Sequence, residues 1–215
     1  MNIEFVTPSK VGGYVRVDLD NQCKDFLWKV TRKGWKSFNA KPRLAGNISH
    51  SYDLIDEDNF FFNNVLADCI DKYKEVTGEH IMFPDVNSIV QDISSKDFEL
   101  SSFWSNYQYK HEFNPFHLHD GVYSFAIWLQ IPYSWEGQTK LPLFNGTKKN
   151  DVMAGNFVFE FTDMFGRILA ETFRLGPYSE GTMVFFPARL RHAVYPFYNT
   201  DQPRISISGN ITLKK

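Results

Sequence analysis

The chain has 215 residues, a formal net charge of −2 at pH 7 and an aromatic content of 17% that includes 21 phenylalanines. This length suffices for a full hydrophobic core and lies in the range of one large β domain, so we expect a single domain over residues 1–215. The near-neutral charge excludes an electrostatic basis for nucleic-acid binding. No stretch approaches the ~18 apolar residues of a membrane span, and the N-terminus lacks the basic start and apolar core of a secretory signal, so we expect no membrane partner and a cytoplasmic location.

The N-terminal residues predict strands followed by a helix. Ile3 to Val17 has an extended pattern broken by Gly12-Gly13, which indicates one or two strands with a turn. Asp20 or Asn21 can cap the helix that follows, and Gly34 can end it. The apolar stripe of this helix has the spacing i, i+3, i+4, i+7 and consists of Cys23, Phe26, Leu27 and Val30.

A second helix is expected after the acidic sequence Asp56-Glu57-Asp58, with an apolar face that continues to Tyr73 and an end at Gly78. The acidic residues at its start are interpreted as capping groups. Cys23 and Cys69 both fall on apolar helix faces, so we expect buried thiols rather than a disulfide. After this helix, 87–91 is expected to be a short buried piece. Residues 1–97 therefore form the helical support and N-terminal strands.

Residues 98–215 carry almost continuous strand signal. Helices followed by many short strands favour an antiparallel sandwich or jelly roll, with the helices packed on one outer sheet face. The expected fold class is therefore mainly β (α+β). The one long connection, 132–155, has the length of a lid or a substrate-contacting insertion, and Trp104, Trp128, Tyr133 and Trp135 are candidates for lining an entrance. The expected strands are 98–113, 122–131, 156–162, 168–175, 181–187, 193–198 and 204–213.

The sequence Phe116-His117-Leu118-His119-Asp120-Gly121 places two histidines two residues apart before an apolar strand. On an extended segment His117 and His119 face the same way and can grip one ion, whereas Asp120 faces the other way unless the chain turns. Two imidazoles suit zinc, copper, iron or nickel. The alternative is that both histidines are hydrogen-bonded structural residues near a strand end.

His192 is the candidate third ligand, because it begins a new strand after the apolar strand 181–187. The last strand alternates, with an apolar face on one side and a polar face that begins at Arg204 on the other. If helices cover the outside of the sheet, the polar face points into the barrel, where an arginine needs an anionic partner such as a ligand carboxylate. The polar face consists of Arg204, Ser206, Ser208 and Asn210, and the apolar face of Ile205, Ile207, Ile211 and Leu213.

The motifs His117-x-His119, the distal His192 and the following Arg204-x-Ser206 resemble those of the iron(II)- and 2-oxoglutarate-dependent dioxygenases. The nearest group has a His-x-His first motif and ends in an Arg-Ile-Ser-Ile-x-x-Asn strand. This group occurs in bacteria and in viruses of cyanobacteria. If the protein is viral, the expected location is the host cytoplasm. The resemblance covers about 98–213. It implies a double-stranded β-helix (jelly roll) fold, Fe(II) and 2-oxoglutarate as cofactors, O2 as cosubstrate, and a prolyl-hydroxylase-like activity on a protein or peptide side chain.

The same resemblance implies the site residues. Iron would be held by His117, His119 and His192, with Asp120 as the alternative second ligand, since most of the superfamily has a carboxylate there. The far carboxylate of 2-oxoglutarate would meet Arg204. Ser206, Tyr107 and Asn210 are the further cofactor-binding candidates.

Two alternatives remain open at the sequence level. A cupin-like binding module could use the same barrel without a redox metal, and a three-histidine thiol dioxygenase could use Arg204 to clamp an amino-acid carboxylate. Geometry offers one test of the architecture. On a simple hairpin Arg204 would lie roughly 16 Å from His192, whereas in a jelly roll the two strands belong to facing sheets about 10 Å apart, so both residues can hold one small dicarboxylate.

Overall fold

The structure is a computed structural model that describes residues 1–9, 12–34, 39–77, 94–163 and 165–214. The expected helix end at Gly78 and the expected buried piece at 87–91 lie outside these ranges. Among the described helices, none combines the length and the apolar character needed to cross a membrane.

The first helix forms where the sequence predicts it. Helix α1 (Asn21–Gly34) begins after Asp20, whose side-chain Oδ1 accepts a hydrogen bond from the backbone N–H of Cys23 at 2.8 Å, and it ends at the expected glycine. Cys23 and Cys69 are both buried free thiols, as expected. Burial raises the pKa of the Cys23 thiol to about 12, so this thiol stays protonated and unreactive at neutral pH.

The second helix is less regular than expected. A 3-10 turn (Glu57–Asn59) and a π turn (Phe62–Leu66) precede helix α2 (Ala67–Thr77). Asp58 and Asn59, with left-handed φ values of 55° and 53°, separate the 3-10 turn from the helical backbone that follows. The capping interpretation is confirmed at Asp56, whose carboxylate accepts hydrogen bonds from two backbone N–H groups of the following turn at 2.7 and 2.8 Å.

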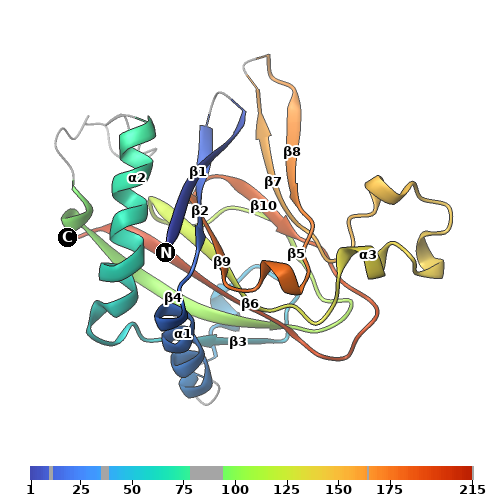
Figure 1. Cartoon of the computed structure of the whole chain (residues 1–215), viewed down its shortest axis with the longest axis horizontal. Helices are drawn as coiled ribbons and strands as arrows, with labels where there is room; N and C mark the ends of the chain where they lie inside the picture. The colour runs from blue at the N-terminus through green and yellow to red at the C-terminus, as the bar shows by residue number, and fades with distance from the viewer. Residues whose placement is uncertain (10–11, 35–38, 78–93, 164, 215) are drawn as a thin grey trace.

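Eleven strands form two antiparallel sheets among the described residues, which confirms the mainly β, jelly-roll fold. The seven-stranded sheet has the order β1-β2-β9-β6-β11-β4-β3, and the four-stranded sheet has the order β5-β10-β7-β8. Figure 1 shows the strands between α2 at the left and the long connection with α3 (Trp135–Gln138) at the right. The strands are β1 (Asn2–Ser9), β2 (Gly12–Asp18), β3 (His50–Asp53), β4 (Phe98–Gln108), β5 (Asn114–His117), β6 (Tyr123–Gln130), β7 (Phe157–Thr162), β8 (Ile168–Phe173), β9 (Thr182–Pro187), β10 (Arg191–Val194) and β11 (Arg204–Leu213).

The strand expected over 98–113 ends earlier in the structure. β4 ends at Gln108, and residues 109–113 connect it to β5, which lies in the other sheet. The chain turns between them at His111, whose φ is 70° and whose backbone N–H donates to Phe197 O at 3.0 Å. Because the chain crosses here from the seven-stranded to the four-stranded sheet, β5 faces β11 across the space between the sheets and is not its neighbour within one sheet.

The long connection 132–155 contains short helical pieces. Helix α3 (Trp135–Gln138) is followed by two 3-10 turns, and further 3-10 turns occur elsewhere. The 3-10 turns outside the α2 region are Lys41–Arg43, Ser95–Asp97, Pro142–Phe144, Lys149–Asp151 and Pro177–Ser179.

The two faces of the larger sheet bury different clusters, and this division orients the site. Ile205, Ile207 and Ile211 of β11 pack with α1 and α2 on the outer face, as expected. Trp128 and Phe186 belong instead to a second cluster between the two sheets. The polar residues of β11 therefore point between the sheets, which confirms the expectation from the strand's alternation.

Candidate active site

A cavity of about 150 Å³ lies between the two sheets. This volume is roughly ten times the ~10–15 Å³ that one water molecule needs, so the cavity can hold a small dicarboxylate. Both groups of sequence-predicted residues line it. The metal-competent group is His117, His119 and His192, and the polar group from β11 is Arg204, Ser206, Ser208 and Asn210.

Backbone pairing brings the three histidines together. His117 on β5 lies directly opposite His192 on β10 in the register of the four-stranded sheet. His119 follows the end of β5, where its backbone N–H donates to Ala188 O at 2.9 Å. The ring centroids are 4.2 Å apart for His117 and His192, 5.1 Å for His117 and His119, and 4.8 Å for His119 and His192.

Hydrogen bonds fix which ring nitrogens face one another. His117 Nδ1 donates to Pro115 O at 2.7 Å, and His192 Nδ1 donates to Leu190 O at 2.8 Å. With the proton on Nδ1, each neutral ring keeps a lone pair on Nε2. The Nε2 atoms of His117 and His119 lie 3.2 Å apart, and the three histidines offer ligand atoms within 4.8 Å of one another. Lone pairs that converge in this way are a suitable site for a cation.

His119 is oriented by two polar side chains behind it. Its Nδ1 lies 2.9 Å from Asn210 Oδ1 and 2.5 Å from Ser124 Oγ, and Ser124 in turn donates to Gly209 O at 2.8 Å. Asn210, expected to bind the cosubstrate, lines the cavity and contacts the His119 ring through its Oδ1. Ser124 was not predicted, since a serine inside an apolar strand carries no local signal of this contact.

Burial keeps the three imidazoles neutral. It lowers the pKa of His117, lowers that of His119 to about 4, and lowers that of His192 well below its usual value; the neighbouring rings of the cluster lower the last two further. Neutral imidazole is the form that binds metals, so at neutral pH protons do not compete for these nitrogens.

Arg204 is 1% exposed, and every acceptor that its guanidinium contacts in the described part of the chain is a neutral oxygen. Nη1 donates to Tyr133 Oη at 2.6 Å and to Gly155 O at 3.1 Å, and Nη2 donates to Gln108 Oε1. A buried cation without a carboxylate partner is costly. The cavity side of Arg204 is therefore suited to an anion.

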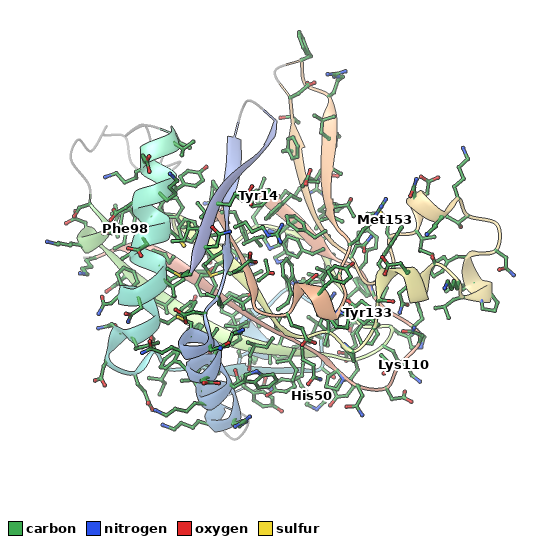
Figure 2. The ribbon with its side chains drawn as sticks, in the orientation of Figure 1. Tyr14, His50, Phe98, Lys110, Tyr133 and Met153 are labelled. Carbon is green, nitrogen blue, oxygen red and sulfur yellow. The ribbon has the colours of Figure 1, made fainter. Side chains whose placement is uncertain are left out.

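Tyr107, expected beside Arg204, lies on the other side of the sheet, and that expectation is corrected. Tyr107 pairs with Ile205 in register and packs in the helix-side cluster, whereas Gln108 pairs with Arg204. Adjacent strand residues face opposite sides, so Tyr107 cannot point into the cavity. Tyr133 and Gln108 hold Arg204 instead. Tyr133 and Met153, both from the long connection, are labelled on the α3 side of the molecule (Figure 2).

Asp120, the alternative metal ligand, is exposed at the cavity wall and does not belong to the group of three ligand atoms. The chain does turn at the next residue, where Gly121 has a φ of 91°. Of the aromatic candidates for an entrance, Trp104 and Trp128 line the cavity. Trp135 contacts Arg174 and Lys149 instead, whose cationic groups lie 4.1 and 5.6 Å from its ring centroid.

Comparisons with known proteins identify a family for this chain and solved structures that resemble it. A family model described as "Putative 2OG-Fe(II) oxygenase" matches residues 102–210, which is half of the chain. A 2OG-Fe(II) oxygenase family oxidoreductase from Burkholderia pseudomallei is similar in structure, with 14% identity and a TM-score of 0.54 over 94% of this chain and 85% of that one. A Pseudomonas putida prolyl-4-hydroxylase has 14% identity and a TM-score of 0.49 over 95% of each chain.

No curated protein matches the sequence. The structural likeness supports the shared jelly-roll fold, and the family model extends over β4 to β11, the strands that carry the three histidines and Arg204. The chain therefore belongs to the 2OG-Fe(II) oxygenase family and is an oxygenase that depends on iron(II) and 2-oxoglutarate.

Proposed function

We propose that His117, His119 and His192 bind Fe(II), that Arg204 and Ser206 bind the far carboxylate of 2-oxoglutarate, and that the enzyme hydroxylates a protein or peptide side chain. One observation carries the proposal. Three unprotonated imidazole nitrogens and one uncompensated guanidinium line the same cavity from facing sheets. A ligand with a chelating end and a far carboxylate matches both groups.

The donor set fits iron. Imidazole nitrogens suit Fe(II). Two nitrogens that each lie about 2.1 Å from a metal, with an angle of 90° between the two bonds, are about 3 Å apart. The Nε2 atoms of His117 and His119 lie at a similar distance of 3.2 Å. The second polar contact of each ring supports the same role, because ligating histidines nearly always donate their other N–H to an oxygen. Bound iron with 2-oxoglutarate supplies O2 activation and the oxidation of a C–H bond.

The charges also fit the cosubstrate. Three neutral histidines leave both charges of Fe(II) uncompensated, and Arg204 adds a third positive charge in the same cavity. A dicarboxylate offsets two of the three. The residues of the chain would then bind and orient 2-oxoglutarate. The imidazoles would hold its chelating end through the metal, and Arg204 would hold its far carboxylate. Water would be excluded by three rings around His192, those of Phe157, Phe159 and Phe186.

The peptide substrate is proposed from the surface beside the triad. β5 is an edge strand of the four-stranded sheet, and Phe113 and Leu118 at its two ends are 40% and 48% exposed. Asn47 already pairs with Phe113, so an extended peptide could lie along the rest of this edge, toward Leu118, and place a side chain at the cavity. Nothing in the described part of the chain favours a non-catalytic binding module or a thiol dioxygenase.

We also propose that residues 1–215 act as one domain. β1, β2 and β3 from the N-terminal segment belong to the same sheet as β4, β6, β9 and β11, and α1 and α2 cover that sheet. The N-terminal segment therefore supplies part of the sheet as well as its helical cover.

The test is turnover of 2-oxoglutarate to succinate with added Fe(II) under air, together with iron content of the loaded protein. The wild-type chain and the surface variant His50→Ala should bind iron and decarboxylate 2-oxoglutarate, uncoupled or with a substrate peptide. His192→Ala should lose both. A wild-type protein that takes up no iron and forms no succinate refutes the proposal.

A further inference from the structure

A β-bulge in β5 turns a second side chain toward the metal-competent histidines. His117 pairs with His192 and Asn114 pairs with Val194, so three steps along β5 match two steps along β10. On a regular strand, residues three apart face opposite sides. The extra residue lets Asn114 and His117 both line the cavity. Bulges often re-aim a side chain beside an active site.

Only one of the two polar atoms of the Asn114 carboxamide has a hydrogen-bond partner. Its Nδ2 lies 3.2 Å from His117 Nε2, the lone-pair nitrogen that faces His119. Its Oδ1 is buried and has no hydrogen-bond partner within the described ranges. Buried polar atoms are almost always paired, so this unpaired oxygen is unusual, and Nδ2 is the side of the amide that faces the histidines.

A fixed loop holds the carboxamide in place. A Cβ on Gly46 would lie 3.1 Å from both Cγ and Oδ1 of Asn114, so the absence of a side chain there lets the loop pack closely on the amide. The loop is tied down by Lys41 Nζ, which donates to Gly46 O at 2.6 Å, and by a backbone bridge between Asn47 and Phe113. Asn114 is therefore positioned before any ligand binds.

Asn114 also lies between the two ends of the proposed cosubstrate site. Its partner Val194 lines the cavity two residues beyond His192. The chain then continues to Phe197, which stacks on the Tyr133 ring at a centroid distance of 4.6 Å, and Tyr133 contacts Arg204. A ligand that extends from the histidines toward Arg204 thus passes Asn114.

We propose that the Asn114 carboxamide binds the metal-chelating end of 2-oxoglutarate, an inference that rests on the proposed function. When a metal takes the lone pair of His117 Nε2, Nδ2 of Asn114 loses its acceptor. This N–H then donates to a carboxylate oxygen of the cosubstrate, whereas Oδ1 stays buried against the loop at Gly46. Asn114 is in this way a cosubstrate-binding residue that becomes available only in the metal-loaded protein.

The test separates metal binding from cosubstrate binding. Dissociation constants for Mn(II) alone, and for 2-oxoglutarate on the Mn(II)-loaded protein, are measured by titration calorimetry for the wild type and for Asn114→Leu and Asn114→Asp. Asn145→Leu, on an exposed turn, is the control. We expect Asn114→Leu to bind Mn(II) within about threefold of the wild type but 2-oxoglutarate about 10-fold more weakly, the usual effect of losing a hydrogen bond to a charged group.

Asn114→Asp keeps the shape of the side chain and replaces the donor by a negative charge. It should bind Mn(II) at least as tightly as the wild type and 2-oxoglutarate more weakly than Asn114→Leu does, a pair of opposite effects that a folding defect does not produce. Wild-type affinity for 2-oxoglutarate in both variants, or equal losses for metal and cosubstrate, overturns the assignment of Asn114 alone. Failure of the wild type to bind 2-oxoglutarate overturns the proposed function and this assignment together.

Discussion

Arg204 donates to the hydroxyl of Tyr133 at 2.6 Å, and that hydroxyl donates onward to Gly155 O at 2.7 Å. The two side chains come from different segments, β11 and the connection after β6, and both are almost fully buried. Burial raises the pKa of Tyr133, although the nearby guanidinium opposes the shift, so the phenol remains a neutral acceptor for Arg204. This contact orients a cation toward the cavity without neutralising it.

Tyr133→Phe removes that acceptor and should loosen Arg204. Nη1 keeps only Gly155 O at 3.1 Å, so we expect the free energy of unfolding to fall by about 1 kcal/mol and the affinity for 2-oxoglutarate to fall about 10-fold. Chemical denaturation and cosubstrate titration of the metal-loaded protein measure the two effects. Tyr178→Phe is the matched control, because Tyr178 is 64% exposed and lies outside the cavity lining. Unchanged cosubstrate affinity in Tyr133→Phe would contradict a role for this contact in binding.

Residue alternation allowed the faces of β11 to be predicted, because one face carries only apolar side chains and the other begins with an arginine. The caps at Asp20 and Asp56 were also predictable, since such contacts are local in sequence. These features depend on neighbours within a few residues. His192 was chosen as the third ligand because it begins a strand after 181–187, and the family resemblance then implied that it joins His117. No local pattern links two residues on separate strands.

The misplacement of Tyr107 shows what alternation alone leaves undetermined. Tyr107 and Gln108 differ by one position, and a one-residue change in register moves every side chain of a strand to the opposite face. The pairing of Gln108 with Arg204 decides the matter, and that pairing is a long-range contact. Asn114 was missed for the same kind of reason: only the bulge in β5 turns it inward, and bulges have no reliable sequence signal.

Asn210 and Ser206 should differ in what their loss affects. Asn210 contacts His119 Nδ1, so Asn210→Leu should weaken metal binding about 10-fold, although Ser124 Oγ still accepts from the ring. Ser206 lines the cavity on the Arg204 side, so Ser206→Ala should leave metal affinity unchanged and weaken 2-oxoglutarate about threefold. Separate metal and cosubstrate titrations of both variants test this. The reverse pattern would exchange the two roles.

The stability of the metal-free protein should depend on pH through the histidine cluster. The pKa of His119 is about 4 in the folded protein against 6.5 for an unperturbed histidine, so between these values the unfolded chain binds more protons. The contribution of neutral His119 is fully present above pH 6.5 and is lost as the pH falls toward 4, by up to about 3 kcal/mol. Urea denaturation of chelator-treated protein from pH 7.5 to 4.5 measures it.

The difference between variants isolates this effect from the titration of carboxylates. His119→Gln should lose less stability than the wild type over the same interval, whereas the surface variant His50→Gln should follow the wild type. Bound metal should move the loss to lower pH, because the ion competes with protons for the same nitrogens. Identical pH profiles for the wild type and His119→Gln would show that His119 does not carry the dependence.

Gly121→Ala should disturb the turn that places His119. Gly121 has a φ of 91°, and an added Cβ would lie 2.7 Å from the backbone oxygen of Ile211, which already accepts a hydrogen bond from the N–H of Val122 at 2.8 Å. The backbone must therefore shift, and we expect a loss of about 2 kcal/mol or more in the free energy of unfolding. Because His119 lies two residues earlier, the affinity for a divalent metal should fall as well.

Gly146→Ala is the matched control, since a Cβ there would meet no atom within 4 Å and its φ lies outside the left-handed range. Denaturation and metal titration of both variants measure the two effects, and a Gly121→Ala protein with wild-type stability and metal affinity would show that this turn is not needed to position His119.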